Sequence, residues 1–142
     1  MKLNCKVKAP ASFIYKQLIK SSINDIKGAT GKVLTVDELE GFQYDKVFSS
    51  KHHGTVTILS VVENEQYCFR TKTKIRDFET SYTLKATGDH SCEVVVEERV
   101  LTKGLMLKYN DILMEIISGR ARKRQFKMNL EALASSYSQK DA

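Results

Sequence analysis

The sequence predicts a single α+β domain in which a curved antiparallel sheet of six or seven strands wraps around a long C-terminal helix. Three observations predict it. A strand pattern at residues 2–8 runs into Pro10 and a helical pattern, residues 42–101 alternate like strands, and from Leu105 the apolar spacing changes to every three or four residues. With 142 residues, 42% of them hydrophobic, the chain has the size and composition of one domain spanning 1–142.

The first strand is predicted from Leu3, Cys5 and Val7, which alternate with polar residues. Pro10 ends this strand and suits the first turn of a helix, because proline lacks an N–H and has a fixed φ. Apolar residues then follow at helical spacing as far as Ile26.

One or two short helices are compatible with this segment, since the serines at 21–22 could divide it, and the glycines at 28 and 31 end it. Residues 32–41 fit a short strand or a helical turn equally well. The turn is suggested by Thr35 and Glu38, which have the spacing of a capping box.

Five strand candidates follow one another, at 42–49, 55–62, 66–74, 77–87 and 91–101. Residues that pair across neighbouring strands must point to the same face of a sheet. Turns at 63–66, 76–77 and 88–90 place every apolar row on one face and give an antiparallel meander. The resulting register pairs Ile58 with Thr71, Thr71 with Tyr82, and Tyr82 with Val96, so Tyr82 is expected at the centre of the inner face.

The last element is a helix of about 30 residues, or about 45 Å. Its apolar stripe runs from Tyr109 to Tyr137 and includes Ile112, Ile116, Phe126, Leu130 and Leu133. Gly119 and Lys123 fall on this stripe between its two halves. Lys123 is therefore expected to point inward, and Gly119 permits a kink or a close approach.

The order of these elements is similar to that of a known superfamily. The chain resembles the START-like helix-grip superfamily, also called SRPBCC. The resemblance rests on residues 7–10 (Val-Lys-Ala-Pro), on Phe13-Ile14 and Gln17-Leu18 behind them, on the meander and on the final helix. That superfamily includes pollen-allergen-like and polyketide-cyclase-like proteins. More narrowly, the chain resembles a small bacterial family of unknown function within that superfamily. This closer resemblance rests on residues 39–46 (Leu-Glu-Gly-Phe-Gln-Tyr-Asp-Lys), Gly119-Arg120 and Lys123-Arg124. The resemblance implies a cavity between the sheet and the long helix and brings no catalytic residues.

The predicted inner face holds more polar residues than a solid core would accept. Besides apolar rows it presents Tyr44, Lys46, Ser60, Thr71, Thr73, Thr80, Tyr82 and Glu98. A buried polar group needs a hydrogen-bond partner, so a lined cavity explains this face. The equally weighted alternative is that Lys46 and Glu98 lie at the rim and that threonine simply favours strands. The candidate ligand-binding residues are Tyr44, Lys46, Phe69, Thr71, Tyr82, Glu98, Ile116 and Gly119.

The net charge of +6 is concentrated near the C-terminus. Between Lys103 and Lys127, seven basic and two acidic residues give +5. Cations on a helix can neutralise phosphates of nucleic acid or anionic lipid. Tryptophan is absent and no helix-turn-helix is readable, so no specific nucleic-acid partner is expected, and a solvated helix face is the favoured interpretation of residues 120–124.

The remaining reactive groups predict neither a metal site nor catalysis. His52 and His53 are adjacent on an expected loop, and neighbouring side chains of an extended chain diverge. Glu97 and Glu98 face opposite sides of a strand, so they cannot share an acid–base site. No phosphate loop, nucleophile elbow or zinc spacing is present in the sequence.

Three cysteines, an odd number without motif spacing, indicate free thiols in a reducing compartment. Cys5 and Cys92 are expected in the core, and Cys68 on the outer face, where Arg70 and Lys72 could lower its pKa. No secretory signal and no transmembrane segment are readable, so a cytoplasmic location is expected.

We therefore expect a non-enzymatic module that needs no cofactor or metal and holds a small, mainly apolar ligand, lipid-like or aromatic, between the sheet and the C-terminal helix. A second hypothesis is an interaction protein that offers the basic helix face to an acidic partner or surface. A third is a lyase or cyclase with Glu98 as acid or base. Polar residues converging on a cavity favour the first hypothesis, and a continuous basic face favours the second. The oligomeric state stays open.

Overall fold

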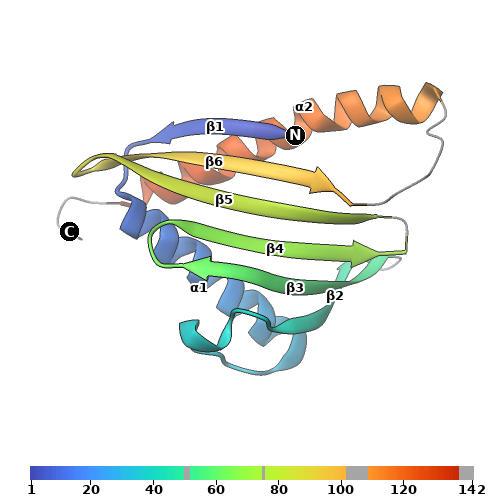
Figure 1. The fold of residues 1–142 in the computed structure, drawn as a ribbon, viewed down its shortest axis with the longest axis horizontal. Helices are drawn as coiled ribbons and strands as arrows, with labels where there is room; N and C mark the ends of the chain where they lie inside the picture. The colour runs from blue at the N-terminus through green and yellow to red at the C-terminus, as the bar shows by residue number, and fades with distance from the viewer. Residues whose placement is uncertain (50–51, 75, 102–108, 138–142) are drawn as a thin grey trace.

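The structure, a computed structural model, describes residues 1–49, 52–74, 76–101 and 109–137, and at 49 and 109–118 it describes the backbone alone. One antiparallel sheet carries the fold, with strand order β1-β6-β5-β4-β3-β2 (Figure 1). The elements in chain order are β1 (Lys2–Val7), α1 (Ala11–Thr30), the 3-10 helix η1 (Val36–Glu38), β2 (Gln43–Ser49), β3 (His52–Val62), β4 (Gln66–Thr73), β5 (Asp77–Gly88), β6 (Ser91–Val100) and α2 (Tyr109–Ser135).

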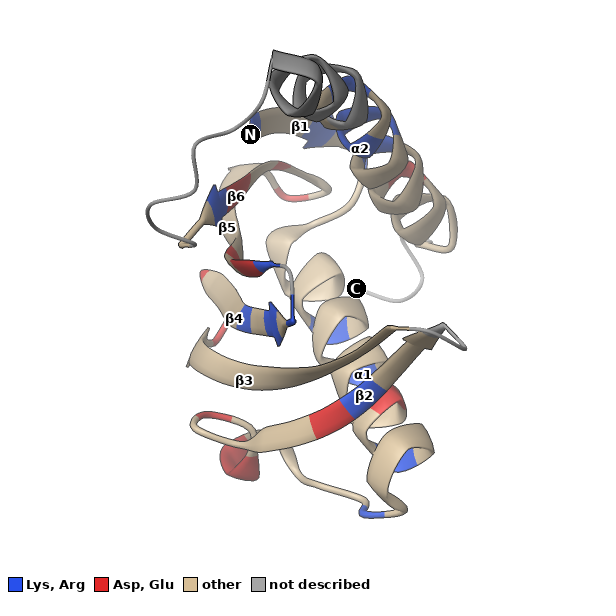
Figure 2. Cartoon of the chain, turned by 90° about the vertical axis from the view of Figure 1, so that its right-hand side faces the viewer, with Lys and Arg blue, Asp and Glu red and all other residues tan. Residues whose placement is uncertain are grey.

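Both helices lie on the same side of the sheet, which curves around them (Figure 2). We call this side the concave face. Helix α2 lies against β1, whereas α1 contacts β2 and β4 to β6, and the two helices touch each other. The predicted architecture is thus confirmed, with one change. The long helix shares the concave face with α1 instead of covering it alone.

Helix α1 is a single helix, so of the two alternatives for this segment the one without a division at the two serines is confirmed. Ser22 is buried and accepts a hydrogen bond from the Tyr67 hydroxyl at 2.8 Å, so its hydroxyl is satisfied without interrupting the helix. Gly31 ends the helix with φ 78°, a left-handed conformation that suits glycine, and its N–H donates to the Lys27 carbonyl at 2.8 Å.

The uncertain segment 32–41 contains a helical turn. Thr35 and Glu38 form the complete capping box around η1, and the Thr35 N–H donates to Glu38 Oε1 at 3.0 Å. Of the two expectations for this segment, the helical turn is confirmed.

The sheet register agrees with the prediction between β5 and β6 and differs between β3 and β4 and between β4 and β5. Tyr82 pairs with Val96 and Thr80 with Glu98, as expected. Between β4 and β5, Phe78 and not Tyr82 pairs with Thr71. This shift is even, so Tyr82 still points to the concave face.

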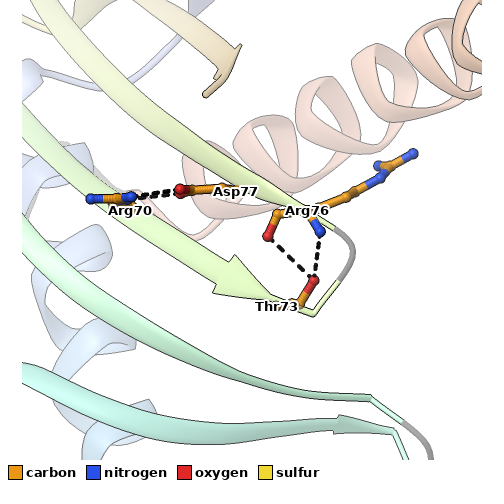
Figure 3. A network of polar contacts seen from close by, with 4 residues as sticks. All are labelled: Arg70, Thr73, Arg76 and Asp77. Atoms are coloured by element: carbon orange, nitrogen blue, oxygen red, sulfur yellow. Dashed lines mark hydrogen bonds and ion pairs between the residues drawn. The ribbon is translucent and has the colours of Figure 1, made fainter. Parts of the chain in front are cut away.

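The β4–β5 turn lies earlier in the chain than predicted, and two polar contacts fix it there (Figure 3). The Thr73 hydroxyl donates to the Arg76 carbonyl at 3.3 Å and accepts from the Arg76 N–H at 3.0 Å, closing the turn. Arg70 donates two hydrogen bonds, of 2.7 and 2.5 Å, to the Asp77 carboxylate. Because these pairs depend on side chains across the turn, alternation alone does not reveal them.

A β-bulge between Ile58 and Ser60 changes the β3–β4 register. Ile58 pairs with Phe69 instead of Thr71, and beyond the bulge Val61 packs against the core. Ser60 pairs with Cys68 and donates to Gln66 Oε1 at 3.2 Å. The expectation that Ser60 belongs to the inner face is therefore wrong.

The described part of α2 turns one stripe of side chains inward. Leu130 is 1% exposed, and Phe126 and Leu133 are partly buried against the core. Lys123 is exposed, contrary to the prediction, and Arg122, four residues before Phe126, lies on the inward side. The side chains of Ile112 and Ile116 lie outside the described ones.

Candidate functional site

Aromatic rings form a continuous row across the concave face. The ring of Tyr67 lies 5.5 Å from that of Phe69 and 6.4 Å from that of Tyr82. Tyr82 meets Phe126 of α2 edge-on, with 6.1 Å between ring centroids. We call these four residues the aromatic row. Three of them, Phe69, Tyr82 and Phe126, are only half-buried, so their apolar surface is partly open to water.

A charged pair lies at the α2 end of the aromatic row. The Arg122 Nη2 donates a short hydrogen bond to the Glu98 carboxylate. The Glu98 side chain is 10% exposed and that of Arg122 is 41% exposed. The Arg122 guanidinium also lies 5.9 Å from the Phe78 ring centre and 5.6 Å from that of Phe126. Two aromatic faces and a carboxylate thus hold the cation in place.

Two hydrogen-bond donors of this cluster are left without a partner among the described residues. The Nε of Arg122 is buried and makes no hydrogen bond. The Tyr82 hydroxyl makes none either. Burial raises the pKa of Tyr82 to about 12; Tyr67 and Glu98 raise it as well, and Arg122 opposes them. At neutral pH this hydroxyl is therefore protonated and able to donate.

A second polar cluster ties β2 to α1. The Tyr44 hydroxyl donates to Asp25 Oδ2 at 2.5 Å, and Lys46 Nζ lies 2.9 Å from Asp25 Oδ1. Burial raises the pKa of Tyr44, and the hydrogen bond that its hydroxyl donates to Asp25 raises it further. Tyr44 and Lys46 thus contact the same carboxylate of α1, which the sequence did not single out.

The structure divides the predicted site residues into two groups. Tyr82 and Glu98 lie together on neighbouring strands, whereas Tyr44 and Lys46 lie on β2, with β3, β4 and β5 between β2 and β6. Phe69 and Thr71 occupy the concave face between the two groups, Phe69 half-buried and Thr71 4% exposed.

The two remaining predicted residues are on α2. At Gly119 an added methyl group would meet no atom within 4 Å, so this turn of the helix is open on that side. The side chain of Ile116 lies outside the described ones.

Sequence reasoning missed Asp25 and Arg122 as parts of these clusters and assigned Phe126 to packing alone. Asp25 carries no motif. The position of Arg122, one helical turn before Phe126, was a usable signal, because side chains four residues apart on a helix share a face.

Two hollows open elsewhere on the described surface. One, of about 800 Å³, lies over β2 to β4, where Thr55, Thr57 and Arg70 line it together with Lys46. The other, of about 550 Å³, lies between the start of α1 and the turn at 63–65. Of the predicted site residues, Lys46 lines the first hollow.

The cysteines are free thiols, with Cys5 and Cys92 buried as expected. The suggestion that neighbouring cations lower the pKa of Cys68 is wrong, because burial raises it and outweighs the influence of Arg99. His52 and His53 are exposed and belong to β3 instead of a loop.

In the described ranges, no group of three or more His, Cys, Asp or Glu side chains is placed to hold a metal ion. Within the same ranges, no helix is both long and apolar enough to cross a membrane.

Solved structures show which fold this is. DynU16, a protein of the dynemicin biosynthetic locus, matches with a TM-score of 0.64 at 12% identity over 96% of this chain and 47% of that one, so the chain spans about half of DynU16. Ara h 8.0201 matches with a TM-score of 0.64 at 12% identity over 96% of this chain and 97% of that one. Truncated norcoclaurine synthase from Thalictrum flavum matches with a TM-score of 0.50 at 16% identity over 70% and 72%.

At such identities the likeness shows the fold alone, and that fold is the predicted helix-grip fold. No curated protein matches the sequence significantly. Residues 1–119 match a family described as Domain of unknown function (DUF3284).

Proposed function

Since the chain belongs to the family described as Domain of unknown function (DUF3284) and has the helix-grip fold, we propose that it binds a small, mainly apolar ligand, lipid-like or aromatic, between the concave face and α2. The observation that supports this proposal most strongly is the aromatic row. Three of its rings remain half-buried, and the Glu98–Arg122 pair lies at its α2 end. Covering such rings with an apolar molecule removes their surface from water, worth about 25 cal/mol per Å².

The predicted residues take distinct roles in this proposal. Phe69 and Tyr82 line the apolar part of the site, with Ile116 and Gly119 contributing from α2. Thr71 lies beneath them on the concave face, and Glu98 belongs to the polar end. We assign Tyr44 and Lys46 a different task, because Asp25 already engages both: they hold α1 against β2 at the other end of the face.

The contacts of Glu98 support binding more than they support catalysis in this chain. One neighbour is named a synthase, so the fold is compatible with enzymes. In this chain Arg122 engages Glu98, the residue considered as acid or base. We therefore propose a non-enzymatic binding module and keep a lyase or cyclase as an outcome that a product assay would reveal.

The test is a fluorescence titration with N-phenylnaphthylamine, a neutral apolar probe that brightens out of water. We expect saturable binding at one site per folded chain, weakened several-fold in Tyr82→Ala. Thr83→Ala is the matched control, because Thr83 is the next residue of β5 and points to the other face of the sheet. Wild-type protein that binds no probe, or equal weakening in both variants, contradicts the proposal.

A second candidate function has one specific observation in its favour. Arg120, Lys123, Arg124 and Lys127 are exposed and stand at helical spacings of three and four, so they form one continuous basic stripe along α2 (Figure 2). No ion pair of the described residues involves these four. Such a stripe suits an acidic partner or surface.

Sedimentation with vesicles containing phosphatidylserine tests this candidate at physiological salt. The variant Arg120→Glu/Lys123→Glu/Arg124→Glu reverses three charges of the stripe and leaves the inward Arg122 in place. Wild-type binding that the variant loses favours the second candidate. Binding that vanishes as salt rises indicates only non-specific attraction and leaves the ligand-binding proposal ahead.

A further inference from the structure

We infer that the polar group of the ligand is a neutral oxygen acceptor, such as a ketone, ester or amide carbonyl, held by Arg122 Nε and the Tyr82 hydroxyl. This inference rests on the proposed function, because it names the chemistry that the same site selects. It assigns a binding role to Arg122, which belongs to none of the predicted contacts.

The buried Nε of Arg122 is the first observation. It has no hydrogen-bond partner among the described residues, although its neighbour Nη2 binds Glu98. A buried donor without a partner is rare in folded proteins, because it has lost its hydration and gained nothing in return. An oxygen atom brought in by a ligand would satisfy it.

The position of the guanidinium is the second observation. Phe78 and Phe126 flank it and Glu98 fixes one edge, so its free Nε–H has a defined direction before any ligand arrives. Tyr82 touches the same Phe126 ring edge-on. Tyr82 pairs with Val96 of β6, and Thr80, two residues before Tyr82 on β5, pairs with Glu98. The two donors therefore belong to one cluster.

The charge of the cluster selects the kind of acceptor. Arg122 is already neutralised by Glu98, whose side chain is 10% exposed. A carboxylate or phosphate at Nε would lie near this buried negative charge and would have to displace it or be repelled. A carbonyl oxygen accepts the same hydrogen bond without that penalty.

Both donors also retain their protons at neutral pH. Arginine stays charged under all ordinary conditions, and burial keeps the Tyr82 hydroxyl protonated. The site therefore offers an N–H and an O–H, which favours ligands that bring an acceptor oxygen.

The experiment compares three probes with the same aromatic body, namely acetylnaphthalene, ethylnaphthalene and naphthoate, in calorimetric titrations of the full chain at neutral pH. We expect acetylnaphthalene to bind at least about fivefold more tightly than ethylnaphthalene, because its carbonyl oxygen can accept one or two hydrogen bonds that ethylnaphthalene cannot. Naphthoate is expected to bind no better than acetylnaphthalene.

Arg122→Lys keeps the positive charge beside Glu98 but removes Nε, and Tyr82→Phe removes only the hydroxyl. Each should shrink the preference for acetylnaphthalene over ethylnaphthalene and leave ethylnaphthalene binding nearly unchanged. The second variant decides the matter if the first fails to fold. Glu131→Gln, an exposed change on the same helix, should leave all three affinities as in the wild type.

The outcomes separate the two claims. If no probe binds the folded wild-type chain, the proposed function fails and this inference with it. If acetylnaphthalene and ethylnaphthalene bind equally well, or naphthoate binds best, the site exists but the inference about its chemistry is wrong. A loss of affinity for all three probes alike in both variants shows a merely structural role and also overturns it.

Discussion

Glu98 and Arg122 form the charged contact that links β6 to α2. Replacing Glu98 by glutamine leaves the Arg122 cation near two aromatic rings without its counter-charge. We expect Glu98→Gln to lower the free energy of unfolding by about 1–3 kcal/mol, less than for a fully buried pair because Arg122 is 41% exposed.

Urea denaturation of Glu98→Gln and Glu97→Gln measures this effect. Glu97 is the exposed neighbour on the opposite face of β6, so its variant should unfold like the wild type. Equal stability of the two variants would show that the pair contributes nothing to the contact.

Two tyrosines of the aromatic row, Tyr67 and Tyr82, make stability depend on alkaline pH. Burial raises the pKa of Tyr67 to about 12 and that of Tyr82 to about 12, above the value of about 10 in an unfolded chain. A raised pKa means that the folded state holds the proton more tightly. Its contribution is complete below about pH 10 and is lost as pH rises toward 12, by up to about 1.4 kcal/mol per pH unit for each tyrosine.

Urea denaturation at a series of alkaline pH values checks this prediction. Tyr82→Phe should reduce the slope of unfolding free energy against pH by the share of one tyrosine. An unchanged slope would mean that Tyr82 is solvated like an exposed tyrosine.

At this scale the sequence predicted the inward direction of Tyr82, since strand alternation survives every even shift of register. It did not predict Arg122. The apolar stripe of α2 passes between positions 122 and 123, and only the packing of Phe126 and Leu130 decides which of the two turns inward.

At the scale of elements, the orientation of α2 positions the basic stripe outside and the aromatic contact inside. Leu130 anchors this orientation, being 1% exposed. We expect Leu130→Ala to destabilise the domain by about 2–5 kcal/mol, because it removes buried methyl groups and leaves a cavity.

Met128 provides the matched control on the same helix. It is 56% exposed, so Met128→Ala should change the melting temperature little. Similar losses in the two variants would contradict the orientation of α2 described above.

The strands themselves were predictable because alternation and turn residues mark them, and the β5–β6 register followed from its turn at 88–90. The β3–β4 and β4–β5 registers did not follow. A bulge after Ile58 has no sequence signature, and the β4–β5 turn is selected by Arg70 with Asp77 and by Thr73 with Arg76.

At the scale of the whole molecule, two helices share the concave face of one sheet. Helix α1 is held at the β2 side by Asp25, Tyr44 and Lys46, and α2 is held at the β6 side by Glu98 and Arg122. The aromatic row lies between these two attachments. The overall order of elements was enough to predict this architecture, whereas the chemistry of the two attachments needed the structure.

The most direct test of the central claim is an amide NMR titration of isotope-labelled protein with acetylnaphthalene. The account predicts saturable shifts, with a single affinity, that cluster at Phe69, Tyr82, Val96 and Phe126, whose side chains face the space between the sheet and α2. Shifts confined to the basic stripe or to outward residues such as Thr83, or no shifts from a folded chain, would contradict it.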